Sequence, residues 1–399
     1  MSAKQAISAP DTKTGASANW NYPTAVKVGA GRVKELPGFC QALGMKNPLL
    51  ITDPGLAPLP MVASAVRSCQ AAQLGCAVFS GIKGNPTGKN VVDGVAAFRA
   101  GSHDGVIAFG GGSALDAAKA VALMAGQDRP LWDFEDIGDN CLRVNVAGMA
   151  PVVAVPTTAG TGSEVGRASV ITDDAAHVKR IIFHARMLPA IVILDPELTV
   201  GLPPKLTAAT GMDALSHNLE AYCSPFYHPM ATGIAVEGIR LVKQWLPLAV
   251  QDGNNLEARL QMLVASSMGA TAFQRGLGAM HALAHPLGAL YDAHHGMLNA
   301  ILMPYVLQAN RAVIDEGCTR LARYLELPQP SFASFLAWVL DLRQTVGIPH
   351  TLEAIGIDAE RAELVGRMAV ADGSAGTNPI QFSESEYAGI LRNAVAGRL

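Results

Sequence analysis

Side chains that bind metal ions are concentrated in one stretch of the chain, where six of the ten histidines lie between His217 and His295. Asp213 and His217 are four residues apart, and His281 and His285 repeat this spacing. Residues four apart lie on the same face of a helix, so each pair presents two ligand-type side chains together. A single histidine on an apolar helix is most often structural, but two such pairs followed by His295 indicate a shared metal site.

A carboxylate with several imidazoles and no thiolate is typical of Fe(II), Zn(II) or Mn(II) sites and not of structural zinc sites built from cysteine. The spacing does not select which three imidazoles bind, because His285 and His294 lie in the same stretch. It also does not distinguish iron from zinc, since both accept this ligand set. Beside a dinucleotide, such an ion would act as a Lewis acid on the substrate oxygen during hydride transfer.

A glycine turn between a strand and a helix predicts an anion site in the first half of the chain. Residues 106–109 (Val-Ile-Ala-Phe) run into residues 110–113 (Gly-Gly-Gly-Ser), and a helical pattern follows over residues 114–119. Glycines let the backbone approach a ligand closely, and the free N–H groups of the helix N-terminus face the phosphate. Turns of this kind also occur for purely structural reasons, so the motif needs a second observation beside it.

A second polar turn follows another strand, at residues 156–164 (Pro-Thr-Thr-Ala-Gly-Thr-Gly-Ser-Glu), and it is the second observation that supports an anion site. Its hydroxyls could simply cap the backbone of their own loop, but two such turns at strand ends together favour a dinucleotide. Asp53 ends a strand, where a carboxylate accepts hydrogen bonds from a ribose and repels a 2′-phosphate, which favours NAD over NADP. Because Asp53 precedes the glycine turn, the order differs from the usual dinucleotide-binding fingerprint, and a plain Rossmann domain is not expected.

The chain divides into an α/β half and a helical half, which together must position the polar turns and the histidines. The first half of the chain alternates short β-branched runs with alanine-rich helical stretches, which predicts βαβ units around a mostly parallel sheet. From about Pro203 the pattern is helical almost to the end. We therefore expect a disordered tail over residues 1–18, an α/β dinucleotide-binding domain over 19–198 and a helical metal-binding domain over 199–399, with the site between the two domains. The predicted strands are Ala25–Val28, 48–52, 76–79, 105–109, 152–155, 168–172, 179–183 and 190–194.

The composition argues against a nucleic-acid-binding, membrane-spanning or secreted protein. The chain has 399 residues, half of them hydrophobic, and its net charge of -3 gives no electrostatic reason to expect nucleic acid or an acidic membrane as a partner. Its longer apolar runs fall far short of the roughly 20 residues that span a bilayer. The six cysteines are scattered without a CxxC pair, and residues 1–18 lack the apolar core of a secretory signal. A reduced, cytoplasmic protein that acts on a small molecule is expected.

Five segments combine the motifs described above: residues 109–113 with Asp116, residues 156–164, 195–198 and 211–217, and residues 278–296. Together they resemble the iron-containing (group III) alcohol dehydrogenases, over nearly the whole chain after its tail. The resemblance implies the fold shared with dehydroquinate synthase, which has an N-terminal α/β dinucleotide-binding domain and an all-α C-terminal domain. It also implies an enzyme that interconverts a primary alcohol and its aldehyde with Fe(II), or Zn(II), and NAD. We expect a homodimer or a higher homo-oligomer.

The resemblance assigns roles to individual residues. His285 matches the histidine that the family places near the nicotinamide and the substrate, and it is interpreted as the catalytic proton relay. His294 would be a neighbour of the metal site and not a ligand. The metal ligands implied are Asp213, His217, His281 and His295. The cofactor contacts implied are Asp53, Asn85, Gly111, Gly112, Ser113, Asp116, Thr157, Thr158, Thr161, Ser163 and Lys179.

Two arginines suggest that the substrate carries a negative charge. Arg167 follows the second turn, and Arg275 lies just before the histidine helix, where the sequence departs from the usual family segment. An arginine binds a carboxylate with two parallel hydrogen bonds, although either residue could instead form an ion pair within the protein. The pattern from Asp195 to Asn299 resembles the 4-hydroxybutyrate dehydrogenase branch of the family. An ω-hydroxy acid and its semialdehyde are therefore the expected substrates.

Other functions share parts of this pattern. A lyase of the dehydroquinate-synthase type has the same architecture, but its sugar-phosphate substrate would call for more basic residues around the metal. A hydroxyacid–oxoacid transhydrogenase would keep its nicotinamide tightly bound and need no free NAD. Metal-free relatives such as maleylacetate reductase are disfavoured because the full set of one aspartate and three histidines is present. For the same reason, a binding protein without catalytic activity is not favoured.

Overall fold

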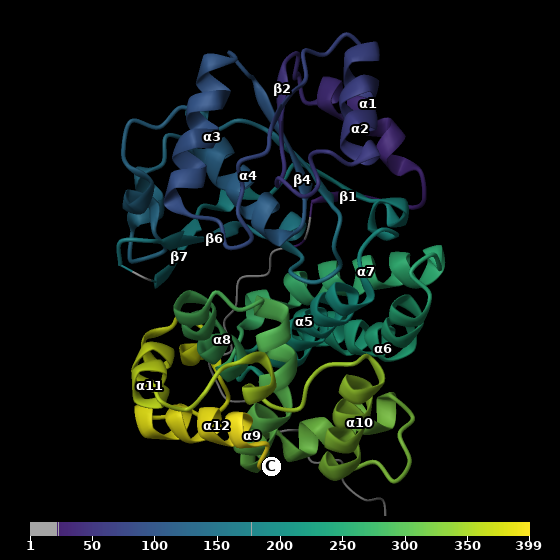
Figure 1. The fold of residues 1–399 in the computed structure, drawn as a ribbon, viewed down its shortest axis with the longest axis vertical. Coiled ribbons are helices and arrows are strands. Elements are labelled where there is room, and N and C mark those ends of the chain that lie inside the picture. Colours follow the sequence, from purple (N-terminus) through teal and green to yellow (C-terminus); the bar gives the residue numbers. More distant parts are fainter. Residues whose placement is uncertain (1–21, 23, 177) are drawn as a thin grey trace, which may run out of the picture.

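The computed structural model describes residues 22, 24–176 and 178–399. The tail predicted over residues 1–18 lies outside the described residues, so it stays a prediction. The described chain forms a part built on a parallel sheet, followed by a part built from helices, and Figure 1 shows the first above the second. The expected fold class is therefore confirmed. Each predicted strand is present with ends within one residue of those expected.

The central sheet has six strands in the order β1-β8-β5-β4-β2-β3, and every neighbouring pair is parallel. All residues of β2, β4 and β5 are buried, as expected for a parallel sheet covered on both faces. The strand bounds are β1 Ala25–Val28, β2 Pro48–Ile51, β3 Ala77–Phe79, β4 Gly105–Gly110, β5 Val152–Pro156 and β8 Ile191–Leu194.

Alternate residues of each strand serve two separate cores. On one face, Ile107 and Phe109 of β4 pack with α1 (Leu36–Ala42) and α2 (Pro60–Ala71). On the other face, Val106 and Ala108 pack with α3 (Gly88–Ala100) and α4 (Gly112–Met124). This two-residue period is the physical basis of the predicted strand, since successive side chains of a strand point to opposite faces.

A two-stranded antiparallel hairpin lies beside the main sheet. Its strands are β6 (Ala168–Asp173) and β7 (Val178–Phe183), and β6 packs against α4. The Thr172 amide donates to the Pro86 carbonyl at 2.7 Å, which ties the hairpin to the loop before α3. The opposite strand, β7, contacts α8 of the helical part. The hairpin thus bridges the sheet and the histidine helices.

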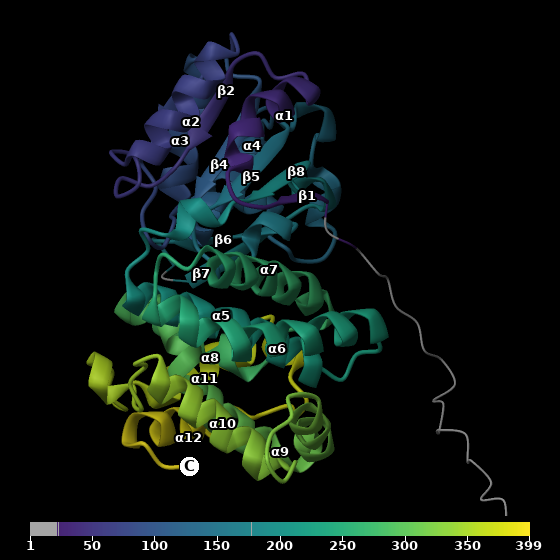
Figure 2. The same ribbon diagram turned by 90° about the vertical axis from the view of Figure 1, so that its right-hand side faces the viewer.

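No strand follows β8 among the described residues, and the chain continues as helices. The first, α5, is buried on nearly all sides from Thr207 to Ala221, so its polar residues become interior groups. Figure 2 shows α5 and α7 directly below the sheet part. The helices are α5 Pro204–Cys223, α6 Pro229–Gln251, α7 Leu256–Ala272, α8 Ala279–Tyr291, α9 His295–Tyr324, α10 Phe332–Thr345, α11 Ala362–Ala371 and α12 Glu384–Ala396.

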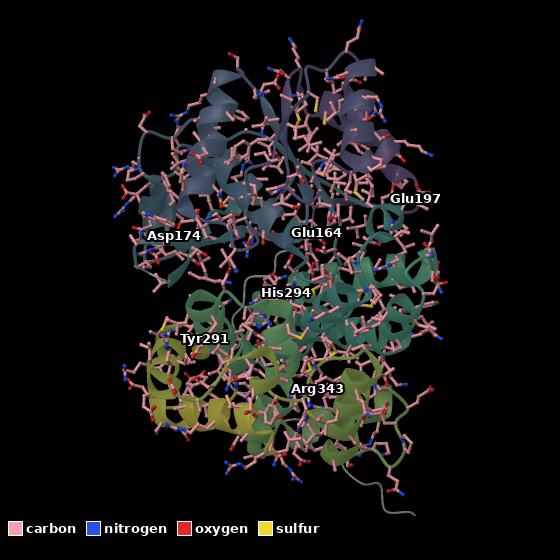
Figure 3. The ribbon with its side chains drawn as sticks, in the orientation of Figure 1. Glu164, Asp174, Glu197, Tyr291, His294 and Arg343 are labelled. Atoms are coloured by element: carbon pink, nitrogen blue, oxygen red, sulfur yellow. The ribbon has the colours of Figure 1, made fainter. Side chains whose placement is uncertain are left out.

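The second polar turn sits directly on the helical part. The Ser267 hydroxyl of α7 donates to a carboxylate oxygen of Glu164 at 2.7 Å, and both side chains are buried. A Cβ atom added at Gly162 would lie 2.2 Å from the Cβ of Ala270, so only glycine permits this approach. Figure 3 shows Glu164 and His294 near the level where the two parts meet. None of the described helices is both long and apolar enough to cross a membrane.

Candidate metal and cofactor site

Four predicted ligands converge from three helices. Asp213 and His217 lie on α5, His281 lies on α8, and His295 is the first residue of α9. One ligand atom from each lies within 4.8 Å of all the others. Asp213, His217 and His281 are buried, and His295 is partly buried. A carboxylate and three imidazoles at this spacing match the donor set of a Fe(II) or Zn(II) site.

Two of the histidines are oriented by acceptors behind them. His217 Nδ1 lies 3.2 Å from the Gly160 carbonyl, and His281 Nδ1 lies 2.6 Å from Oε2 of Glu220. An acceptor at Nδ1 places the proton there and leaves the Nε2 lone pair free for a metal. Glu220 is buried and also accepts the amides of Gly278 and Met280, so this carboxylate holds both the ligand and the start of its helix.

Asn299 faces the ligand atoms directly. Its Nδ2 lies 2.8 Å from Oδ1 of Asp213 and 3.1 Å from Nε2 of both His281 and His295. Within the described residues, its Oδ1 and the Nδ1 of His295 are buried without a hydrogen-bond partner. Lone-pair atoms of Asp213, His281 and His295 thus converge on one amide group, and such a convergence fits a site that a metal cation would occupy.

Burial keeps most of this cluster neutral. Burial lowers the pKa of His217 to about 4, and burial together with the other histidines lowers the pKa of His295 well below its usual value. For His281 burial acts in the same direction, but the charge and hydrogen bond of Glu220 outweigh it and raise the pKa. Neutral imidazoles are the metal-binding form, and the Glu220 carboxylate makes His281 a stronger donor.

His285 lies beside these four side chains and outside the group whose possible ligand atoms converge. Its ring stacks on His295 with centroids 5.4 Å apart and meets His281 edge-on at 5.9 Å. Its Nδ1 lies 2.7 Å from Oδ2 of Asp372, which is at the C-terminal end of α11. His294 instead caps α9 by accepting the Met297 amide, as a neighbour of the site.

The two polar turns meet at the ends of adjacent strands. β4 ends at Gly110 and β5 ends at Pro156, and the Thr157 amide donates to the Gly110 carbonyl at 3.0 Å. A Cβ atom at Gly112 would lie 2.4 Å from Cγ2 of Thr161, so the turns touch because residue 112 is glycine. The structure therefore brings together the predicted cofactor residues of both turns, Gly111, Gly112, Thr157, Thr158 and Thr161.

Asp53 completes this region from the neighbouring strand. It follows β2, which lies next to β4, and the chain winds away from these two strands in opposite directions. Ligands of open α/β sheets bind at such a switch point, outside the carboxyl ends of the strands. Oδ1 of Asp53 accepts the amides of Gly55 and Leu56, and Oδ2 would lie 3.7 Å from a Cβ at Gly110. One carboxylate oxygen thus faces the glycine turn.

Three other predicted cofactor residues link this region to the rest of the protein. The Ser163 hydroxyl donates to Asp116, whose other oxygen accepts the Val170 amide at 3.0 Å. The Ser113 hydroxyl donates to the Gly84 carbonyl. These hydrogen bonds hold the second turn, the hairpin and the loop before α3 around the glycine turn.

Asn85 and Lys179 reach from the α/β part towards the helical part. Nδ2 of Asn85 donates to Oδ1 of Asp292 at the end of α8 at 2.6 Å. Lys179 of β7 lies against Gly288 of α8, since a Cβ there would be 3.3 Å from its ammonium group. Burial lowers the pKa of Lys179, opposed by surrounding carboxylates that include Asp213. Lys179 therefore lies between the cofactor turns and the metal ligands.

Comparison with known proteins identifies this arrangement. The family model described as iron-containing alcohol dehydrogenase matches residues 23–196, and the model of the C-terminal part of the same family matches residues 207–395. The chain belongs to the iron-containing alcohol dehydrogenase family. It is therefore an enzyme, an alcohol dehydrogenase whose site carries the residues expected to bind iron.

Several named dehydrogenases are similar to this chain over nearly its whole length. The chain is 38% identical to 4-hydroxybutyrate dehydrogenase of Cupriavidus necator over 94% of this chain and 99% of that protein. It is 37% identical to 1,3-propanediol dehydrogenase of Klebsiella pneumoniae, with 94% and 96% covered. The crystal structure of a 1,3-propanediol oxidoreductase superposes with a TM-score of 0.90 at 36% identity, covering 94% of this chain and all of that one.

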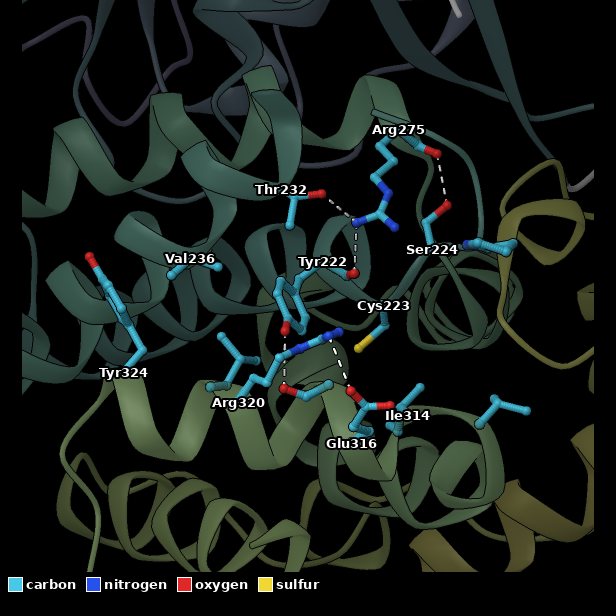
Figure 4. A pocket seen from close by; sticks show the side chains of 14 residues that line it. Tyr222, Cys223, Ser224, Thr232, Val236, Arg275, Ile314, Glu316, Arg320 and Tyr324 are labelled. Atoms are coloured by element: carbon cyan, nitrogen blue, oxygen red, sulfur yellow. Dashed lines mark hydrogen bonds and ion pairs between the residues drawn. The ribbon is translucent and has the colours of Figure 1, made fainter. Parts of the chain in front are cut away.

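The structure does not bring the two predicted substrate arginines to the histidines. Arg275 donates to the carbonyls of Phe226 and Tyr222 and to the Thr232 hydroxyl, in a separate pocket of about 680 Å³ between α6 and α9 (Figure 4). Its position just before α8 in sequence suggested proximity, but the guanidinium turns back to the end of α5.

Arg167 lies at the far end of the hairpin from Lys179. Ala168 pairs with Phe183 while Thr172 pairs with Lys179, so Arg167 is about five residues, or roughly 16 Å, along the strand from the residue facing α8. Its guanidinium lies 5.5 Å from the ring centre of Phe183. Neither arginine is therefore in contact with the metal ligands.

Three functional residues were not singled out from the sequence. Glu220 follows His217 by three residues, and Asn299 follows His295 by four, so helical spacing could have included both. Asp372 lies 87 residues after His285, and nothing local in the sequence connects the two.

Proposed function

We propose that this enzyme is an NAD(H)-linked, iron-dependent dehydrogenase that interconverts 4-hydroxybutyrate and its semialdehyde. The observation that carries the proposal is the convergence of four ligand atoms within 4.8 Å of one another, in a chain whose second polar turn is joined to that cluster. The turn and the cluster are in contact where His217 Nδ1 lies 3.2 Å from the carbonyl oxygen of Gly160.

Each region has a distinct task in the proposed reaction. The glycine turn and the N-terminus of α4 bind the pyrophosphate of NAD, and Asp53 binds the ribose and disfavours NADP. Asp213, His217, His281 and His295 hold the metal, which when bound supplies Lewis-acid polarisation of the substrate oxygen. His285 accepts the alcohol proton at Nε2, and the nicotinamide, when bound, would supply the hydride-accepting chemistry.

The choice of substrate rests on the relatives. Two of them are named for 4-hydroxybutyrate and 1,3-propanediol, which are both short primary alcohols with a second polar group at the other end. The 4-hydroxybutyrate dehydrogenase is 38% identical over 99% of its length, and the 1,3-propanediol dehydrogenase is 37% identical over 96%. NAD as cofactor agrees with an NAD-dependent methanol dehydrogenase from Bacillus methanolicus that is 34% identical. A homo-oligomer in the cytoplasm completes the proposal.

The deciding experiment measures NADH formation by metal-free protein prepared without oxygen and reconstituted in parallel with Fe(II), Zn(II) or no metal. The substrates are 4-hydroxybutyrate, 1,3-propanediol and 1-propanol. We expect activity only with metal and the highest kcat/KM for 4-hydroxybutyrate. Full activity without metal would refute the metal mechanism, and a preference for 1-propanol would refute the substrate. No NADH in any reaction, with nicotinamide still bound to the protein, would identify a transhydrogenase instead.

A further inference from the structure

The partner of His285 comes from a distant part of the chain. Asp372 ends α11, which packs against α8, and its Oδ2 lies 2.7 Å from Nδ1 of His285. Both side chains are largely buried, with 18% of Asp372 and 12% of His285 exposed. At this exposure water does not readily replace the carboxylate as the partner of Nδ1.

The second oxygen of Asp372 is also occupied. Oδ1 accepts the Ser374 amide at 2.8 Å, so the plane and rotation of the carboxylate are determined by the backbone of its own turn. Burial opposes ionisation of this group, but His285, by its charge when the ring is protonated and by its hydrogen bond, outweighs burial and lowers the pKa of Asp372 to about 2. Asp372 is therefore ionised near neutral pH and can only accept hydrogen bonds.

An acceptor at Nδ1 decides which nitrogen of His285 carries the proton. A neutral imidazole has one N–H, and beside an ionised carboxylate that N–H is at Nδ1, which leaves a lone pair at Nε2. His285 stacks on the metal ligand His295 at 5.4 Å, so this ring is beside the place where substrate would bind. Oxidation of an alcohol requires a base there, and Nε2 in this tautomer is one.

We infer that Asp372 is a positioning residue of the reaction, which holds His285 in the tautomer and orientation that accept the alcohol proton. The inference rests on the proposed function, in which His285 is the proton acceptor. When Nε2 takes the proton from the alcohol oxygen, the imidazolium that forms faces the ionised Asp372. The carboxylate stabilises this charge and keeps its own protonation state unchanged.

The test is the substitution Asp372→Asn, because the backbone turn from residue 372 to residue 374 fixes the orientation of the new side-chain amide. The Ser374 N–H retains the amide oxygen at the Oδ1 position, so the NH2 group faces Nδ1 of His285. Nδ1 must then accept, the imidazole proton moves to Nε2, and the base is lost. We expect kcat for alcohol oxidation to fall by about a hundredfold to ten-thousandfold, as when a buried carboxylate partner of a catalytic histidine is replaced by its amide. Metal content and the Kd for NADH should stay as in the unaltered enzyme.

Two further variants separate positioning from general damage. In a His285→Ala background, Asp372→Asn should lower kcat no further, because Asp372 acts through His285. Asp358 offers a matched control, since its Oδ1 accepts the Glu360 amide at 2.9 Å in a similar turn on the surface. Asp358→Asn should leave kcat unchanged.

Three results would overturn the inference: kcat of Asp372→Asn within twofold of the unaltered enzyme, a loss that adds fully to that of His285→Ala, or loss of the metal on substitution. Failure of the proposed function looks different, since the unaltered enzyme would then form no NADH with any metal. If the unaltered enzyme is active and His285→Ala is equally active, the proposed dehydrogenase activity is retained, but the roles proposed for His285 and Asp372 are both refuted.

Discussion

The two polar turns and the histidine cluster lie side by side but offer binding groups of different kinds. The turns after β4 and β5 offer backbone N–H groups and short side chains, and they touch because residue 112 has no Cβ. The cluster offers side chains from α5, α8 and α9, and two of them, His217 and His281, are oriented by a carbonyl or a carboxylate behind them. Added side-chain atoms should therefore disrupt the turns, whereas the loss of a side-chain donor or acceptor should disrupt the histidine cluster.

This difference means that each region can be altered while the other remains intact. The connections between them include the His217 contact with the Gly160 carbonyl and the Asn85 bond to Asp292. Metal content reports on the cluster, and the affinity for NAD reports on the turns. The predictions below use both measurements, in order of decreasing effect.

The largest effect is expected from removing a metal ligand. His281→Ala deletes one of the four donors and leaves the Glu220 carboxylate buried without its histidine partner. We expect the metal to be lost and kcat/KM to fall by at least about a thousandfold, since the Lewis acid is essential to the reaction. Elemental analysis and NADH formation measure the two quantities, and the Kd for NADH should stay within a few-fold. If metal-free His281→Ala retained its activity, the histidine cluster could not be a metal site that the reaction requires.

Glu220→Gln tests whether the support behind a ligand matters as much as the ligand. Both carboxylate oxygens accept N–H groups, so an amide NH2 in either position meets another donor. We expect the metal to bind about ten- to a hundredfold more weakly, as measured by competition with a chelator. The KM for NAD should not change. An unchanged metal affinity would show that His281 keeps its orientation without this hydrogen bond.

Gly112→Val is the corresponding change in the turns. Its Cβ would lie 2.4 Å from Thr161 Cγ2, so the second turn must move away from the first. Overpacking of this kind costs about 1–3 kcal/mol, which corresponds to a roughly ten- to hundredfold rise in the KM for NAD. Metal content should be unchanged. Gly233→Ala is the control, because a Cβ there meets nothing within 4 Å; a similar rise in that variant would mean that the effect is not steric.

The smallest effect concerns stability and pH. The pKa of Asp372 is held at about 2 against an ordinary value of 3.8, so its ionised form stabilises the folded state. The sign follows from linkage: the stabilisation, on the order of 2 kcal/mol, is complete above the unfolded pKa and disappears as the pH falls towards 2. Urea unfolding of metal-free protein should therefore show a difference between the unaltered chain and Asp372→Asn at pH 6 that shrinks at pH 3. A difference independent of pH would rule out the ionised carboxylate as its source.

Much of the fold follows from local sequence. Short β-branched runs such as Ile107 and its neighbours alternate with alanine-rich helical stretches and so predict a parallel sheet, and the loss of that strand–helix alternation after about residue 198 predicts the helical part. Four-residue spacing on a single helix indicated the pairs Asp213/His217 and His281/His285, and the family resemblance then selected the expected ligands. The turns were visible as glycine and hydroxyl residues directly after strands, and the presence of two such turns favoured a dinucleotide site over a purely structural role.

The sequence by itself thus determined the elements, the two glycine-bearing turns and the donor set. The tertiary structure alone decided which side chains meet. It turned Arg275 back to the end of α5, placed Arg167 at the far end of the hairpin from Lys179, and brought Asp372 to His285 from 87 residues away. Helical period and strand alternation act over a few residues and can be read from the chain. Contacts between distant elements depend on how whole helices pack, and no local pattern records that.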